Sequence, residues 1–344
     1  MSLHAFAAAL LADDGTEPWT AGVGHRLEAV VAAMPAHARL GLRAAAAAAD
    51  GYALARTGRP LAALTAAERE TVLAPLAARP ALSALLDVVK MPVLLAGGTE
   101  HMLHHGPGPG TTGAAPAPPP EDPPLDCTPS DHWPARSTAD AVVIGSGAGG
   151  AVAARTLAGV GLSVVVLEEG EHHTTGWFAA RPPLERFTRL YRDGGASLAV
   201  GSPPVLLPQG RAVGGTTVVN AGTCYRTPDR VLRRWSEDFG FRPAGDFGPF
   251  LDEAERSLRV ARQPLDVLGG NGRLALAGAQ RLGWRAAPLR RNAPGCRGAR
   301  ECVAGCPSGA KQSVQLSVLP EACVAGARIV TGARVSRILV DPDA

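Results

Sequence analysis

The stretch Ala-Val-Val-Ile-Gly-Ser-Gly-Ala-Gly-Gly at residues 141–150 decides the fold class of this 344-residue chain. Its first four residues form an apolar run typical of a buried strand, and the glycines that follow have the spacing of a tight turn into a helix. A helical run over 151–160 ends at Gly161, and a second β-type run over 163–167 ends in Glu168. This order predicts a βαβ unit of the Rossmann type that binds a dinucleotide.

The glycines and the acid each have a physical role in such a site. Gly145 allows the tight turn, Gly147 lets the backbone approach a pyrophosphate, and Gly150 lets helix and strand pack closely. The first turn of the helix offers free N–H groups and the positive end of the helix dipole. Glu168 can accept hydrogen bonds from ribose hydroxyls and would repel a 2′-phosphate, which disfavours NADP. The pattern alone does not separate FAD from NAD.

A second glycine loop, Gly-Arg-Ala-Val-Gly-Gly-Thr-Thr-Val-Val-Asn, occupies residues 210–220. Paired glycines and two hydroxyls can wrap closely around a phosphate or a ring edge, and Arg211 can meet a diphosphate. An ordinary glycine turn before a strand is the alternative interpretation.

The two glycine loops together resemble the glucose–methanol–choline (GMC) oxidoreductases, a family of FAD-dependent enzymes that oxidise alcohols. The continuation Thr-Cys-Tyr-Arg-Thr-Pro at 223–228 is similar to the long-chain alcohol oxidase branch. Most of the family has an aromatic residue at the position of Cys224, whereas here the aromatic residue, Tyr225, comes one position later.

The resemblance implies FAD as the cofactor and a set of residues that hold it. Gly145, Gly147, Gly150 and Glu168 would hold the ADP half. The residues that would lie along the diphosphate, the ribityl chain and the flavin ring are Arg211, Gly214, Gly215, Thr216 and Asn220. Val335, on a later strand expected over 333–339, would contact adenine through its backbone.

The fold class is therefore α/β: a Rossmann-type FAD-binding domain, an incomplete GMC fold, preceded by an all-α N-terminal region. We expect a helical N-terminal domain at 1–105, with four or five helices and a capping box at Thr65 and Glu68. A Pro- and Gly-rich linker at 106–138 should be extended and free of core contacts. Residues 139–344 form the FAD-binding GMC N-terminal domain, truncated, with part of the substrate-side insertion at about 171–325.

Cys296, Cys302 and Cys306 have the spacing C-x5-C-x3-C-P, which lacks the close pair and the fourth ligand of a structural zinc site. We therefore expect no metal, and interpret the segment as a compact loop near the flavin that can hold a cysteine pair. Seven basic residues between 281 and 311 have little aromatic interleaving, which favours a solvated or anion-facing loop over a nucleic-acid surface.

The candidate base for alcohol oxidation is not found. None of the nine histidines lies after residue 173, and His172 and His173 should be exposed loop residues at the adenosine end. By resemblance, the base histidine belongs to a C-terminal part that would follow residue 344, so we assign no catalytic residue. Three interpretations stay open: a truncated enzyme, one half of an enzyme completed by a second polypeptide, or a non-catalytic nucleotide-binding remnant.

The composition of the chain argues against some classes of binding partner. A net charge of +3, from 34 basic and 31 acidic residues, does not indicate a nucleic-acid binder. The apolar run 81–98 is interrupted by Asp87, Lys90 and Pro92, so no transmembrane segment is expected, although peripheral membrane contact stays open. Six cysteines in a chain of this length indicate no disulfide framework, which favours the cytoplasm.

From the resemblance we expect an FAD-dependent oxidoreductase acting on the CH–OH group of a small-molecule alcohol, long-chain or lipidic. An NAD-dependent dehydrogenase is the alternative outside the family.

Overall fold

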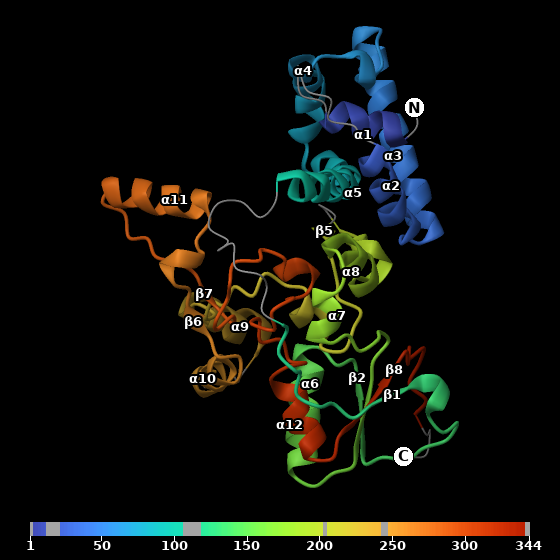
Figure 1. The fold of residues 1–344 in the computed structure, drawn as a ribbon. Coiled ribbons are helices and arrows are strands. Elements are labelled where there is room, and N and C mark those ends of the chain that lie inside the picture. Colours follow the sequence, from blue (N-terminus) through green and yellow to red (C-terminus); the bar gives the residue numbers. More distant parts are fainter. Residues whose placement is uncertain (1–2, 12–20, 106–117, 202–204, 242–246, 341–344) are drawn as a thin grey trace. The chain divides into compact units, whose positions relative to one another are not determined.

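The computed structural model describes residues 3–11, 21–105, 118–201, 205–241 and 247–340 (Figure 1). By its internal contacts the chain divides into two compact units. The first combines residues 1–106 with 182–210, and the second combines 107–181 with 211–344.

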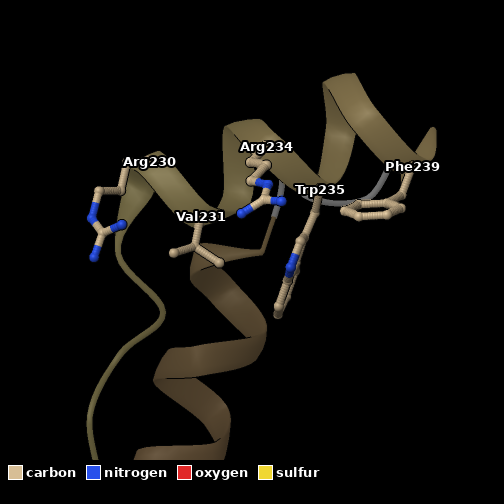
Figure 2. A pocket seen from close by; sticks show the side chains of 5 residues that line it. All are labelled: Arg230, Val231, Arg234, Trp235 and Phe239. Atoms are coloured by element: carbon tan, nitrogen blue, oxygen red, sulfur yellow. The ribbon is translucent and has the colours of Figure 1, made fainter. Parts of the chain in front are cut away.

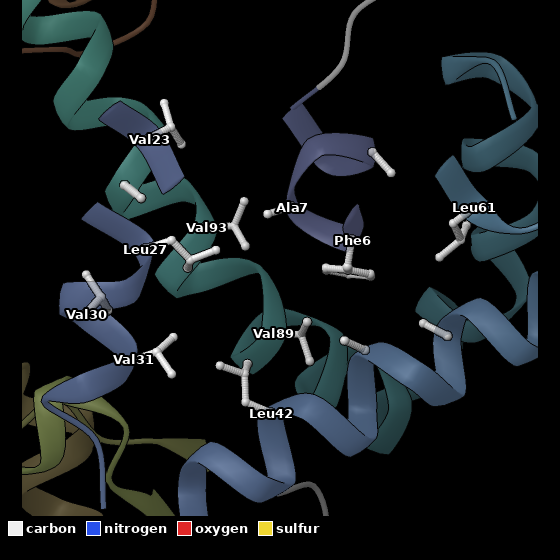
Figure 3. Close-up of a cluster of buried hydrophobic side chains, with 14 of the residues drawn as sticks. Phe6, Ala7, Val23, Leu27, Val30, Val31, Leu42, Leu61, Val89 and Val93 are labelled. Carbon is white, nitrogen blue, oxygen red and sulfur yellow. The ribbon is translucent and has the colours of Figure 1, made fainter. Parts of the chain in front are cut away.

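The described N-terminal part of the first unit contains the helices α1 (Leu3–Leu11), α2 (Ala21–Ala32), α3 (Ala36–Thr57), α4 (Ala66–Ala77) and α5 (Pro80–His105). A 3-10 turn, η1 (Leu61–Ala63), connects α3 to α4. All elements in the described part of residues 1–105 are helical, as the sequence predicts. Figure 3 shows their shared core, where apolar side chains at helical spacing, among them Leu27, Val30 and Val93, are almost completely buried.

Two side chains, those of Thr65 and Glu68, determine where α4 begins. The Thr65 hydroxyl accepts a hydrogen bond from the Glu68 backbone N–H at 3.3 Å, and the Glu68 carboxylate accepts one from the Thr65 backbone N–H at 2.8 Å. This reciprocal pair is the predicted capping box, which satisfies two of the amides that a helix start leaves unpaired.

The sequence assigns residues 182–210 to the nucleotide-binding part, but the structure groups them with the N-terminal helices. They form α8 (Pro183–Leu190), η3 (Arg192–Gly195) and the short antiparallel pair β4 (Leu198–Ala199) and β5 (Val205–Leu206). The physical reason is apolar packing, since Leu184 on α8 joins the buried helical core.

The second unit is organised around a parallel sheet with the strand order β1-β8-β3-β2. The strands are β1 (Cys127–Pro129), β2 (Ala141–Ile144), β3 (Val164–Leu167) and β8 (Arg328–Thr331). Helix α6 (Ala148–Gly159) connects β2 to β3 and lies beside α12 (Val318–Val324) against one face of the sheet (Figure 1). The βαβ unit predicted from residues 141–168 is therefore present, with the two strands paired from Ala141 with Val164 to Ile144 with Leu167.

Two expectations for this unit were wrong. Residues 118–138 are not free of core contacts: β1 extends the sheet beside β8, and Leu125 and Cys127 pack against the core, because an extended proline-rich segment can still pair at a sheet edge. The strand expected at 333–339 lies earlier, at β8. Gly332, with φ of +66°, ends that strand, and residues 333–340 have no regular structure.

Most of the remaining described elements of the second unit lie between β3 and α12 in sequence. The helices are α7 (Thr175–Ala179), α9 (Asp229–Phe239), α10 (Gly248–Ser257) and α11 (Gly270–Arg281). The same interval holds the short pair β6 (Ala261–Arg262) and β7 (Arg290–Arg291) and the 3-10 turns η4 (Gly215–Val218), η6 (Leu265–Val267) and η7 (Cys302–Ala304). A further 3-10 turn, η2 (Ser130–His132), lies between β1 and β2. None of the helices in the described part of the chain has both the length and the apolar character of a membrane span.

Candidate functional site

The first glycine loop joins β2 to α6 and has the geometry that its sequence predicts. Gly145 has a φ of +87°, which favours glycine. A Cβ on Gly150 would lie 1.9 Å from the Gly145 carbonyl oxygen, so only glycine fits there. Gly147 precedes the first residue of α6, and a Cβ built on it would meet no atom within 4 Å. The space in front of Gly147 is therefore open, at the end of the helix that attracts anions.

The second glycine loop lies directly against the first. A Cβ on Gly215 would stand 2.9 Å from the Gly147 Cα, and the Gly214 backbone N–H donates to the Ser146 hydroxyl at 3.0 Å. Both Gly214 and Gly215 have positive φ, at +91° and +54°, a conformation that favours glycine. The structure thus brings together two glycine motifs that are about 65 residues apart in sequence.

Glu168, at the end of β3, is buried and faces the first loop. One carboxylate oxygen, Oε2, accepts from the Ser146 backbone N–H at 2.9 Å and from the Ser146 hydroxyl at 2.6 Å. The other, Oε1, accepts from the Gly170 backbone N–H at 2.9 Å. Because each carboxylate oxygen has two lone pairs, these bonds fix the group and still leave acceptor capacity for a hydroxyl.

Arg211 reaches this region because the chain passes close to Gly170. A Cβ on Gly170 would lie 2.3 Å from the Arg211 carbonyl carbon, and the Val213 N–H donates to the Glu171 carbonyl at 3.0 Å. The backbone of Arg211 is therefore held beside the residues that follow Glu168, while its side chain is exposed.

The segment that carries Val335 lies next to the same residues. The Gly332 N–H donates to the Gly170 carbonyl at 3.1 Å, and the Ala333 N–H donates to the Glu168 carbonyl at 2.8 Å. Val335 follows two residues later in irregular backbone and is half-buried.

Lys311 contacts the C-terminal end of the second glycine loop, at Val218 and Asn220. Its ammonium, with the residue only 2% exposed, donates to the carbonyl oxygens of Val218 at 2.6 Å, Asn220 at 2.7 Å and Cys302 at 2.6 Å. Burial lowers the pKa of Lys311 to about 8. The exposed Thr216 and Asn220 are therefore presented on a backbone that a buried cation fixes at two points.

The cysteine segment packs beside that cation. All six cysteines of the chain are free thiols, so the cysteine pair considered from the sequence does not form. The Arg291 guanidinium donates to the Cys302 sulfur at 2.8 Å, and the Cys306 sulfur accepts from the Lys311 backbone N–H at 3.5 Å. Arg290 pairs with Glu255 at 2.8 Å. Basic residues in this stretch thus have internal partners, and the stretch is not simply a solvated face.

The two histidines after Glu168 were expected to be exposed, and this was wrong. His173 is 6% exposed, packs against Trp177 with ring centroids 4.0 Å apart and the ring planes tilted by 31°, and its carbonyl accepts from the Gln315 amide at 2.7 Å. Burial lowers the pKa of His172. His173 thus connects the chain after β3 to the segment before α12 through its backbone carbonyl.

Sequence reasoning missed two residues of the site, Ser146 and Lys311. Ser146 is the variable position within Gly-x-Gly and gave no signal of its role. Lys311 is one of only two lysines, the other being Lys90, in a chain that otherwise uses arginine, and that rarity was the available signal.

A hollow on α9 lies elsewhere in the second unit. It measures about 340 Å³, and all five residues that line it come from this one helix, as Figure 2 shows: Arg230, Val231, Arg234, Trp235 and Phe239. A hollow between side chains of a single exposed helix lacks the convergent polar groups of a small-molecule site.

Comparison with known proteins agrees with this geometry. Residues 143–202 match a family model for an NAD(P)-binding Rossmann-like domain, and residues 187–344 match the model for GMC oxidoreductases. The fold and the paired glycine loops thus define a dinucleotide-binding protein of the Rossmann class. The chain belongs to the GMC oxidoreductase family.

Three relatives illustrate the match. An uncharacterized GMC-type oxidoreductase of Mycobacterium tuberculosis is 48% identical over 340 residues, which is 98% of this chain and 54% of the relative. An uncharacterized GMC-type oxidoreductase of Sinorhizobium fredii is 36% identical over 59% of this chain and 40% of the relative. A long-chain-alcohol oxidase of Arabidopsis thaliana is 36% identical over 60% of this chain and 28% of the relative. The chain spans about half the length, or less, of these curated relatives.

Proposed function

We propose that this chain supplies the FAD-binding part of an oxidoreductase that oxidises the CH–OH group of an alcohol. The observation that supports it best is the contact between the two glycine loops, which leaves open space at Gly147 while Gly215 closes the other side. The first loop has the fingerprint of a pyrophosphate site, and a second loop against the same helix start can lie along the other half of a dinucleotide.

Each proposed binding residue has a task that its position supports. The Gly147 backbone and the start of α6 would hold the pyrophosphate, with Arg211 adding a positive charge. Gly145 and Gly150 shape the turn, and Glu168 would accept from ribose hydroxyls. Gly214, Gly215, Thr216 and Asn220 would lie along the ribityl chain and the ring, and the backbone at Val335 would meet adenine.

FAD, when bound, supplies the hydride acceptor. The chain's own residues would bind and orient it: Lys311 fixes the loop through the Val218 and Asn220 carbonyls, and Ser146 fixes Glu168. No residue within 1–344 is assigned as the base that takes the hydroxyl proton. We propose that this base comes from sequence equivalent to the remaining part of the relatives, in the same chain or in a second polypeptide.

The substrate class is proposed by analogy. Curated relatives at 28–36% identity are named long-chain-alcohol oxidases, which favours a long-chain or lipidic alcohol. We also propose a cytoplasmic location, supported by the six free thiols.

The experiment that tests the proposal identifies the cofactor and then the reaction. The purified protein is denatured, and the released nucleotide is identified by its absorbance and mass. FAD is expected, and NAD would favour the alternative dehydrogenase. The FAD-loaded protein is then mixed without oxygen with a long-chain primary alcohol, with and without the remaining part of the Mycobacterium tuberculosis relative. Loss of the visible flavin absorbance only with that addition is expected, and loss without it would show that the chain contains its own base.

A further inference from the structure

A groove of about 530 Å³ lies in the first unit, between α1, η1, α4 and α5. Ten of the thirteen residues that line it are apolar, and the other three are Arg69, Glu70 and Lys90. Phe6 and Leu61, both drawn in Figure 3, belong to the buried core and also to the wall of this groove. The groove lies within one compact unit and is not part of the glycine-loop site.

Helix α4 explains why the space is open. It has twelve residues and none of them is buried, although Leu73 and several alanines face the groove. Ala74, Ala77 and Ala78 are spaced three and four apart, so their small side chains share one side of the helix and leave a channel. Apolar surface of this kind is stabilised when an apolar ligand removes it from water.

The walls are fixed by Arg69. Its guanidinium donates to the Leu61 carbonyl at 3.1 Å and also to the Ala9 carbonyl, which ties α4 to η1 and α1. Because these hydrogen bonds hold α4 to η1 and α1, the groove is formed without a ligand, as small-molecule sites usually are.

Lys90 supplies a polar contact to this apolar channel. Its ammonium lies 4.0 Å from the Asp87 carboxylate, which is too far for a hydrogen bond. Among the described residues it has no hydrogen-bond acceptor, so it can donate to a ligand. Glu70, also at the lining and exposed, can accept from one.

We propose that this groove binds a single-chain lipid: an unbranched alkyl chain along the alanine side of α4, with an oxygen head group at Lys90. A hydroxyl or a carboxylate would satisfy this chemistry, since both accept from an ammonium, and a hydroxyl can also donate to Glu70. This binding is independent of the flavin site and would give the helical domain its own ligand.

The test is titration of the intact protein with 1-dodecanol and, separately, with dodecanoate, followed by calorimetry. Ala74→Trp fills the groove, and Ala67→Trp places the same side chain on α4 at an exposed position outside the groove. We expect saturable binding that Ala74→Trp weakens by at least about tenfold and Ala67→Trp leaves unchanged. Ala77→Phe is a second, smaller filling variant in case Ala74→Trp does not fold, and circular dichroism checks both.

The head group is tested with Lys90→Met. Loss of a charge-assisted hydrogen bond should weaken dodecanoate by about tenfold or more, and dodecanol less. Dodecanol binding alone would identify the alcohol as the ligand, and tighter dodecanoate binding would identify the acid. Absence of saturable binding by both, or equal affinity in the Ala74→Trp and Ala67→Trp variants, would overturn the proposal. Gly147→Asp should leave this binding unchanged, which separates it from the proposed function.

Discussion

Gly215 and Gly147 lie in direct backbone contact: a Cβ on Gly215 would stand 2.9 Å from the Gly147 Cα. Gly147 is the N-cap residue of α6 and Gly215 begins η4, so the contact joins two loops that are distant in sequence. On its other side Gly147 has open space, since its own Cβ would meet no protein atom within 4 Å. A side chain added at Gly147 would therefore affect a ligand and not the protein.

The first prediction concerns Gly147→Asp. Its φ of −67° is accessible to every residue, so the fold should persist. The carboxylate would repel a pyrophosphate and occupy its space, so FAD affinity should fall at least about a hundredfold, or roughly 2.7 kcal/mol. Gly159→Ala is the matched control at the other end of α6, where a Cβ also meets nothing, and it should bind FAD as the wild type does.

A second prediction separates structural from functional glycines. Gly150→Ala would place its Cβ 1.9 Å from the Gly145 carbonyl oxygen, inside the contact of α6 with β2. We expect a loss of about 1–3 kcal/mol in the free energy of unfolding, or failure to fold, measured by urea denaturation. Gly147→Ala should change stability by less than about 0.5 kcal/mol. Equal effects of the two substitutions would contradict the assignment of these glycines.

Ser146→Ala tests the link between the loops and Glu168. It removes a hydroxyl that donates to the buried carboxylate at 2.6 Å and accepts from the Gly214 N–H at 3.0 Å. We expect a loss of about 1–3 kcal/mol in unfolding free energy. Ser163→Ala is the matched control, because Ser163 donates to Asp140 at 2.6 Å in an exposed pair, and it should cost less than about 1 kcal/mol. A larger effect at Ser163 would count against the role of Ser146.

The buried Lys311 predicts a pH dependence. Its pKa in the folded protein is about 8, below its ordinary value of 10.5. Between these values the unfolded chain holds more protons, so Lys311 makes the free energy of unfolding rise with pH, at most by about 1.4 kcal/mol per pH unit. Burial raises the pKa of Cys127 to about 12, which acts in the opposite direction above pH 9. The difference between wild type and Lys311→Met isolates the lysine, and a difference that does not vary with pH from 8 to 10 would contradict the prediction.

Local chemistry made part of this structure predictable. The glycines at 145–150, between a strand run and a helical run, are typical of the turn of a βαβ unit, and the Thr65–Glu68 pair indicates the start of α4 directly. Both depend on neighbours in sequence.

The features that were missed depend on contacts between distant residues. Cys127 pairs with Ile329 across the sheet, and nothing in a proline-rich segment indicates such a partner. Lys311 binds carbonyls some 90 residues earlier, and Leu184 joins a helical core whose members precede it by about 90 residues or more. Composition and periodicity carry no information on such pairings. The pairing of β1 with β8, the contacts of Lys311 with the second glycine loop and the packing of residues 182–210 on the helical unit were therefore seen only in the structure.

The central claim, that the two glycine loops form one FAD site, is tested most directly by calorimetric titration of the purified protein with FAD and with NAD, before and after the Gly147→Asp change. The account predicts that the wild type binds FAD in preference to NAD and that the variant, equally stable, binds neither. Preference for NAD, or FAD binding that the substitution leaves unaltered, would contradict it.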